Sequence, residues 1–123
     1  MRILVADDDR TLTQILTATF AKRGWQAGSA ADAMQALMFA KQKPQPDLIL
    51  LDVEMPGGSG LKTLERLKAS ALTMGIPVVV VTGTTDPHAS ERAKELGAVG
   101  FVKKPVDPEA IAKAVEKYFR MNG

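Results

Sequence analysis

The chain contains no cysteine, and only one of its 123 residues is histidine, one is tryptophan and one is tyrosine. Without cysteine it can form no disulfide bond and has no catalytic thiol. His88 is the single imidazole, and we expect it to be exposed, in the first turn after Asp86 and Pro87. No serine–histidine pair stands out, so any nucleophile in this chain is expected to be a carboxylate.

Long apolar runs and a strong charge of one sign are also missing. No apolar stretch approaches the length of a bilayer-spanning helix, and no cationic leader with a small-residue cleavage site is found. The 16 Lys and Arg residues nearly balance the 14 Asp and Glu residues, for a net charge of +2, and no basic run is longer than two residues. We therefore expect a cytoplasmic protein that neither inserts into membranes nor binds nucleic acid directly.

Length and composition are typical of one globular domain. Hydrophobic residues make up 46% of the chain and charged residues 24%, and no repeat, low-complexity tract or linker interrupts it. We expect a single domain over residues 1–123.

Apolar runs and helix-type periodicity alternate along the chain. Strands are predicted for residues 2–6, 25–30, 48–51, 76–82 and 99–102. Helices are predicted for residues 11–23, 31–41, about 61–67, 86–97 and from 107 to about 119. Since parallel neighbours need crossover connections, this order predicts an α/β fold, with a parallel five-stranded sheet covered by helices on both faces.

Two of the predicted helices carry further detail. In the second, Met34, Leu37 and Met38 share one face, the pattern of an amphipathic helix. The fourth takes Asp86 as its N-cap and Pro87 as its first helical residue, a combination that is typical of helix starts.

Chemically active side chains follow four of the five predicted strands. Three aspartates at positions 7–9 follow the first strand, and Asp52 follows the third. Thr82 ends the fourth strand, and Lys103 and Lys104 follow the fifth. Alternation places the two lysines on opposite faces, and Lys104 is the better candidate for a site. Ligands of such sheets bind at the carboxyl ends of the strands, so we expect these side chains to converge on one pocket.

Clustered carboxylates repel one another unless a cation shares their site. Oxygen ligands without histidine or cysteine suit a hard ion such as Mg²⁺, and Mg²⁺ held by few carboxylates tends to recruit phosphoryl oxygens. Lys104 and Thr82 could bind further oxygens of the same group. Asp52, alone at the end of the central strand, is the best candidate for a phosphoryl acceptor, although by itself it could equally cap the turn that follows.

The chain contains four motifs that are specific as a set: ILVADDDRTL, DLILLDVEMPGGSGL, VVVVTGTT and GFVKKPVD. Together they extend over the whole chain and resemble the receiver domain of two-component response regulators. The resemblance implies a flavodoxin-like, doubly wound (βα)5 fold with strand order 2-1-3-4-5. It also implies a phosphorelay signalling switch rather than an enzyme, one that promotes only its own phosphorylation and dephosphorylation. A stand-alone, chemotaxis-type receiver is the form we expect.

Carried over residue by residue, the resemblance makes Asp52 the acceptor of a phosphoryl group from a sensor histidine kinase or a phosphotransfer protein. The implied Mg²⁺ ligands are Asp7, Asp8, Asp52 and the main-chain carbonyl of Glu54. Asp9 is expected to cap the following helix instead, since aspartate is favoured at that position.

The same resemblance makes Thr82 the hydroxyl that turns toward the phosphoryl group. Lys104 is the lysine that pairs with this group, next to a cis peptide bond before Pro105. Phe101 stands where receivers carry an aromatic residue that swings between exposed and buried positions. The implied output face consists of the fourth helix, fifth strand and fifth helix, residues 86–120, where a downstream target protein would bind.

Two positions depart from the family pattern, and a third, Gly83, bears on the lifetime of the phosphorylated form. Gly58 and Ser59 stand where receivers often carry a bulky residue and an acid, so we expect a more mobile loop and different kinase docking. Gly83 leaves room over an acyl phosphate on Asp52, so water should reach it and the phosphorylated form should be short-lived.

Two alternatives remain open. The first motif also fits the D-x-D-x-T pattern of haloacid-dehalogenase-like phosphatases, with Asp7 as the nucleophile and with Asp9 and Thr11 as the other pattern residues. That interpretation leaves Asp52 without a role and finds no second acidic cluster after Lys104. The other alternative keeps the receiver fold but treats it as a docking module that is not phosphorylated.

Overall fold

The computed structural model describes residues 1–57 and 61–122, which form five strands and five helices in strict alternation. The strands are β1 (Arg2–Ala6), β2 (Gln26–Ala30), β3 (Leu48–Leu51), β4 (Val78–Thr82) and β5 (Gly100–Lys103). The helices are α1 (Arg10–Lys22), α2 (Ala33–Lys41), α3 (Lys62–Ala69), α4 (Ala89–Glu95) and α5 (Pro108–Asn122). Every predicted element is present, with ends that differ by a few residues at most. Within the described ranges, none of the helices is both long and apolar enough to cross a membrane.

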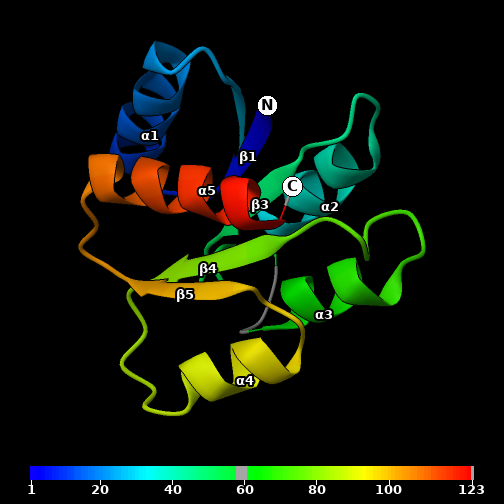
Figure 1. Cartoon of the computed structure of the whole chain (residues 1–123). Coiled ribbons are helices and arrows are strands. Elements are labelled where there is room, and N and C mark those ends of the chain that lie inside the picture. The colour runs from blue at the N-terminus through cyan, green and yellow to red at the C-terminus, as the bar shows by residue number, and fades with distance from the viewer. Residues whose placement is uncertain (58–60, 123) are drawn as a thin grey trace.

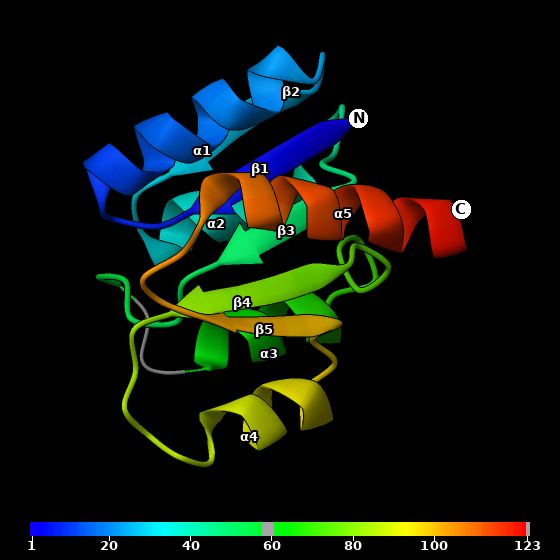
Figure 2. The ribbon, with the colours of Figure 1, turned by 60° about the vertical axis from the view of Figure 1, so that its left-hand side comes forward.

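All five strands run parallel, in the order β2-β1-β3-β4-β5, which confirms the fold expected from the sequence. Helices α1 and α5 cover one face of the sheet, and α2, α3 and α4 cover the other (Figure 1, Figure 2). Each face therefore has its own apolar core, as expected when crossover connections place helices on both sides.

Strand β3 lies at the centre of the sheet, and all four of its residues are buried. Leu48 and Leu50 belong to the core beneath α1 and α5, whereas Ile49 and Leu51 belong to the core beneath α2, α3 and α4. Because both faces are covered, no position of this strand faces water. The first polar side chain follows at its carboxyl end, and it is Asp52.

Helix α2 packs on the sheet through small residues. Its buried side chains are Ala33, Ala36 and Ala40, whereas Met34 and Met38 are 76% and 47% exposed. The predicted face is therefore only partly buried, because Leu37 packs against the core whereas the two methionines are turned toward solvent. Alanine lets the helix come close to the sheet, and this close packing selects the buried face.

Helix α4 begins later than the sequence pattern predicts. Pro87 and His88 form a turn, in which Asp86 Oδ1 accepts a hydrogen bond from the N–H of His88 at 2.9 Å, and the helix starts at Ala89. The assignment of Asp86 as N-cap and Pro87 as first helical residue is therefore wrong, because the carboxylate closes a local turn ahead of the helix. Gly97, with a φ of +100°, ends the helix as predicted.

Replacing Ala36 by leucine should destabilise the fold by about 1–3 kcal/mol, because a larger side chain overpacks a fully buried position. Replacing Met34 by leucine, in the same helix, should change the free energy of unfolding by less than about 0.5 kcal/mol, since Met34 is exposed. Urea unfolding followed by circular dichroism measures both variants. Equal effects would mean that the alanines do not form the packed face of α2.

Candidate functional site

The ends of three strands bring Asp7, Asp52 and Lys104 into direct contact. Strands β1 and β3 are adjacent and pair Ala6 with Leu51, so the next residues, Asp7 and Asp52, leave the sheet side by side. Lys104 follows β5, on the other side of β4 from β3. Its Nζ lies 2.8 Å from Asp7 Oδ2 and 3.2 Å from Asp52 Oδ2. The ammonium group of Lys104 therefore forms ion pairs with both carboxylates.

Main-chain N–H groups hold the two buried carboxylates in place. The N–H of Asp9 donates to Asp7 Oδ1 at 2.9 Å, and the N–H of Glu54 donates to Asp52 Oδ1 at 2.9 Å. In each carboxylate Oδ1 is thus bound by the backbone, while Oδ2 faces Lys104. Asp7 and Asp52 are only 5% and 4% exposed, so both carboxylates are shielded from bulk water.

Asp8 adds a third carboxylate at the mouth of the site. One oxygen each of Asp7, Asp8 and Asp52 lies within 4.8 Å of the others, with Asp8 exposed and the other two buried. An all-oxygen set that is open to solvent on one side suits Mg²⁺, which keeps part of its water shell. The cluster is therefore compatible with a Mg²⁺ site, and the main-chain carbonyl of Glu54 stays a predicted further ligand.

Burial and Lys104 act in opposite directions on the ionised groups. Burial raises the pKa of Asp7 above the usual value for an aspartate, and the hydrogen bonds from Lys104 and from the N–H of Asp9 offset this only in part. Burial by itself lowers the pKa of Lys104, but the hydrogen bond to Asp7 and the charge of Asp52 outweigh it, so this pKa is raised. Lys104 is therefore a cation at neutral pH, and it loses its charge only as the pH rises through that raised pKa.

The hydroxyl of Thr82 is bound by Glu54 rather than by the aspartates. Thr82 ends β4 and is fully buried, and its Oγ1 donates a hydrogen bond to Glu54 Oε1 at 2.9 Å. Sequence reasoning pointed to Glu54 only through its main-chain carbonyl and missed its side chain. The available signal was an acidic residue in the turn after β3, next to the end of the neighbouring strand β4.

Two further predicted residues lie on strand β5 and at its end. Phe101 is partly buried, packs against the core beneath α2, α3 and α4, and borders a cavity of about 220 Å³ between α4 and β5. Its role as a switch stays a prediction. Lys103 is exposed, as alternation predicts, and the Lys104–Pro105 peptide bond is cis, also as predicted.

The loops around the site hold the remaining predicted positions. The side chain of His88 is 74% exposed, which confirms that expectation. Gly83 lies beside the site, where an added Cβ would meet Glu54 Oε1 at 3.9 Å. Gly58 and Ser59, at which the family pattern changes, lie outside the described residues.

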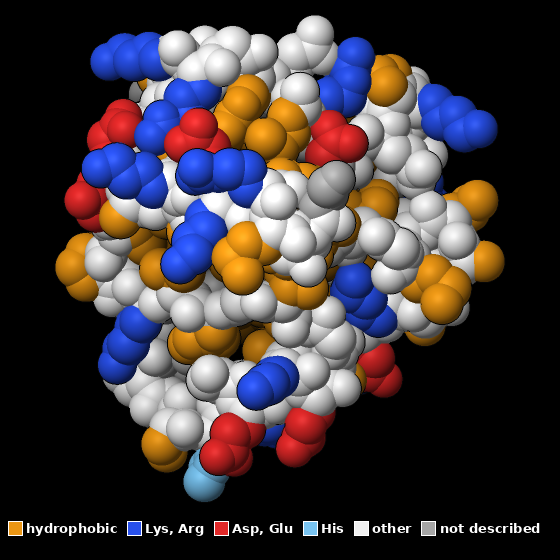
Figure 3. Space-filling model, viewed as in Figure 1, with side chains coloured by type: hydrophobic (Ala, Val, Ile, Leu, Met, Phe, Trp, Pro, Cys, Tyr) orange, Lys and Arg blue, Asp and Glu red, His pale blue; other side chains and the backbone are white. Residues whose placement is uncertain are grey.

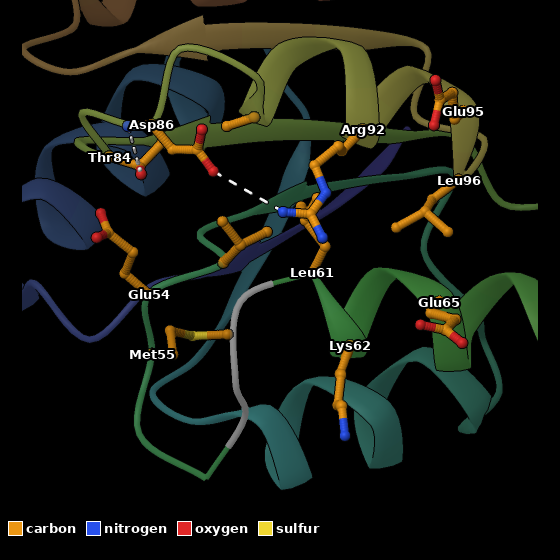
Figure 4. Close-up of a pocket in the computed structure, with 12 residues that line it drawn as sticks. Glu54, Met55, Leu61, Lys62, Glu65, Thr84, Asp86, Arg92, Glu95 and Leu96 are labelled. Atoms are coloured by element: carbon orange, nitrogen blue, oxygen red, sulfur yellow. Dashed lines mark hydrogen bonds and ion pairs between the residues drawn. The ribbon is translucent and has the colours of Figure 1, made fainter.

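A cavity of about 700 Å³ opens between α3 and α4, beside the turn that carries Glu54 (Figure 4). Its apolar lining includes Met55, Leu61 and Leu96. Arg92 points into it, with Nη1 3.9 Å from Asp86 Oδ2. Its other charged lining residues are Glu54, Lys62, Glu65 and Glu95. Space of this size next to an exposed turn lets a side chain move without displacing a packed neighbour.

The structure does not favour the arrangement of a haloacid-dehalogenase-like phosphatase. Asp9 caps α1, with its Oδ1 accepting from the N–H of Leu12 at 3.1 Å. The second aspartate of the D-x-D-x-T pattern is therefore used by the helix, as expected for an N-cap.

Residues 3–116 match the family model described as response regulator receiver domain. Sporulation initiation phosphotransferase F of Bacillus subtilis is 37% identical over 117 residues, which cover 95% of this chain and 92% of that protein. The phosphate regulon transcriptional regulatory protein PhoB of Escherichia coli is 33% identical over 119 residues, which cover 97% of this chain and 52% of that protein. The chain thus spans about half the length of PhoB.

Two solved structures resemble this fold over nearly its whole length. The CheY-like response regulator receiver domain protein from Methanospirillum hungatei has a TM-score of 0.89 and 25% identity, covering 98% of this chain and 94% of that one. Chemotaxis response regulator CheY4 of Vibrio cholerae has a TM-score of 0.84 and 29% identity, covering 94% of this chain and 96% of that one. The likeness is therefore one of complete domains rather than of a shared motif.

Replacing Lys104 by methionine should destabilise the metal-free protein by about 1–3 kcal/mol, because two buried carboxylates then lack their cation. Added Mg²⁺ should recover most of this loss, since it supplies positive charge to the same oxygens. The control is Lys103→Met, one residue earlier and exposed, which should change little. Thermal unfolding with EDTA or with Mg²⁺ measures both, and equal losses would show that Lys104 does not neutralise the aspartates.

Proposed function

The chain belongs to the response regulator receiver domain family, and we propose that Asp52 is the residue on which it takes up a phosphoryl group. One observation carries the proposal. Asp52 is a buried carboxylate at the end of the central strand, with Oδ2 3.2 Å from Lys104 Nζ and a second buried carboxylate, Asp7, beside it. A receiver domain is a signalling switch, so the phosphoryl group would alter its surface and its affinity for partners.

In the proposed reaction an oxygen of Asp52 attacks the phosphorus of a phosphohistidine on a sensor histidine kinase or phosphotransfer protein. The P–N bond breaks with its electrons going to the imidazole, and an acyl phosphate forms on Asp52. Lys104, already bound to both aspartates, would neutralise oxygens of the incoming group. Asp7, Asp8, Asp52 and the main-chain carbonyl of Glu54 would hold Mg²⁺, which supplies further positive charge to those oxygens.

The phosphoryl group would act on Thr82 because it carries about −1.5 to −2 charges and three acceptor oxygens. A turn of Thr82 toward it would shift the loop between β4 and α4, and Phe101 on the neighbouring strand would change position. The output face would be α4, β5 and α5, residues 86–120, where a downstream target protein binds. Charged side chains of both signs lie over α4 and α5, so electrostatic contacts would help to select that partner (Figure 3). A coupling of about 1–3 kcal/mol is typical of such switches.

Incubation of the protein with Mg²⁺ and acetyl phosphate should raise its intact mass by one phosphoryl group, and hydroxylamine should remove that group because acyl phosphates are labile to it. Asp52→Asn should abolish the gain, since no carboxylate remains to attack. Asp47→Asn, just before the opposite end of the same strand, is the control and should leave the gain intact. A wild type that is neither modified nor able to bind beryllofluoride would contradict the proposal and favour an unphosphorylated docking module.

Gly83→Ala should slow the loss of the phosphoryl group severalfold, because a methyl group would fill space over the acyl phosphate and hinder the attacking water. The methyl fits, since a Cβ at Gly83 would lie 3.9 Å from Glu54 Oε1 and 4.0 Å from Lys104 Cβ. The control is Gly75→Ala, whose Cβ would meet no described atom within 4 Å. Phosphoryl loss is followed by mass spectrometry after the donor is removed. An unchanged decay rate in Gly83→Ala would refute the expectation of water access at this position.

A further inference from the structure

Glu54 connects the phosphoryl acceptor to the Thr82 hydroxyl through a single residue. Its main-chain N–H donates to Asp52 Oδ1 at 2.9 Å, and its Oε1 accepts from Thr82 Oγ1 at 2.9 Å. The hydrogen bond between Thr82 and Glu54 uses none of the atoms that form the ion pairs of Lys104 or the cluster of three aspartates. An acidic side chain therefore holds the hydroxyl that the proposed switch has to move.

The bond between Thr82 and Glu54 excludes a second acceptor. A threonine hydroxyl has one proton to donate, and bonds to a carboxylate are stronger than bonds to a neutral acceptor. Thr82 is 0% exposed with Glu54 in place, so its hydroxyl contacts Glu54 and not bulk water in this arrangement. A phosphoryl group on Asp52 must therefore compete directly with Glu54 for this proton.

The carboxylate of Glu54 also has room to leave. Glu54 is exposed in the turn after β3, and it lines the cavity between α3 and α4 (Figure 4). The same cavity is lined by the cations Lys62 and Arg92 and by the acids Glu65, Asp86 and Glu95, so it is a polar space that a charged group can enter. The bond to Thr82 can thus be exchanged, unlike a contact within a packed core.

We propose that Glu54 is a positioning residue whose carboxylate occupies the Thr82 hydroxyl in the unphosphorylated protein and thereby weakens the response to a phosphoryl group by about tenfold. The inference rests on the proposed role of Asp52. It adds that Glu54 sets the threshold of the switch, that is, how strongly a phosphoryl group must bind before Thr82 turns toward it. Glu54 acts through Thr82 and does not touch the transferred group.

Affinity for beryllofluoride in the presence of Mg²⁺ measures this threshold, because the complex imitates a phosphoryl group on an aspartate. Isothermal titration calorimetry on the wild type, Glu54→Ala, Thr82→Val and the double variant forms a double-mutant cycle. Glu54→Ala should bind about tenfold more tightly than the wild type. In the Thr82→Val background, which has no hydroxyl, the same substitution should have a much smaller effect.

Two further variants separate the hydrogen bond from other effects of Glu54. Glu54→Gln keeps an acceptor oxygen without the charge, so its affinity should lie between those of the wild type and Glu54→Ala. Glu65→Ala removes an acid that lines the same cavity, and it should leave the affinity unchanged because the carboxylate of Glu54 still holds Thr82.

The χ1 rotamer of Thr82, measured by NMR scalar couplings in the metal-free protein, gives a second readout. The wild type should show one rotamer, held by Glu54, whereas Glu54→Ala should populate more than one. A single unchanged rotamer in Glu54→Ala would overturn the inference, because packing alone would then position the hydroxyl.

Two calorimetric results would also contradict the inference. An equal gain from Glu54→Ala with and without the Thr82 hydroxyl would overturn the inference, since the effect would then be charge repulsion of the incoming anion. Unchanged or weaker binding by Glu54→Ala would also overturn it. In both cases the wild type still binds beryllofluoride, so the role of Asp52 stands. A wild type that does not bind would overturn the proposed function itself and this inference with it.

Discussion

Two buried carboxylates placed side by side are the constraint on which this structure depends. Asp7 and Asp52 follow adjacent parallel strands and are 5% and 4% exposed, so water screens their repulsion poorly. Lys104 compensates part of it from the far end of the sequence, and the exposed Asp8 adds negative charge that favours a bound cation. Such a site costs stability, which the two apolar cores on either side of the sheet offset.

The turn after β3, residues 52–55, provides both contacts to the core and hydrogen bonds within the site. Val53 and Met55 are buried in the core beneath α2, α3 and α4, and they anchor the turn on both sides of Glu54. Because its backbone is held in this way, Glu54 can place its N–H on Asp52 and its carboxylate on Thr82 at the same time. The proposed acceptor and the Thr82 hydroxyl are thus linked through Glu54 in the unphosphorylated structure.

The two helices of the proposed output face are held unequally. Helix α5 has 15 residues and buries Ile111, Ala112 and Val115, whereas α4 has seven residues and buries only Ala89 and Ala93. Helix α4 also borders the cavity of about 700 Å³ on its α3 side. An element with few buried apolar groups needs little free energy to shift. A displaced β4–α4 loop would therefore move α4 more readily than α5.

Local pattern was sufficient to predict the order of elements and the residues at the strand ends, because an apolar run such as Leu48–Leu51 followed by Asp52 can be recognised without knowing its neighbours. Tertiary packing determined two features that the local pattern could not predict. The face of α2 that is buried through Ala36 depends on how closely the helix approaches the sheet. The partner of Thr82 is Glu54, 28 residues away, and only the adjacency of β3 and β4 brings the two side chains within hydrogen-bonding distance.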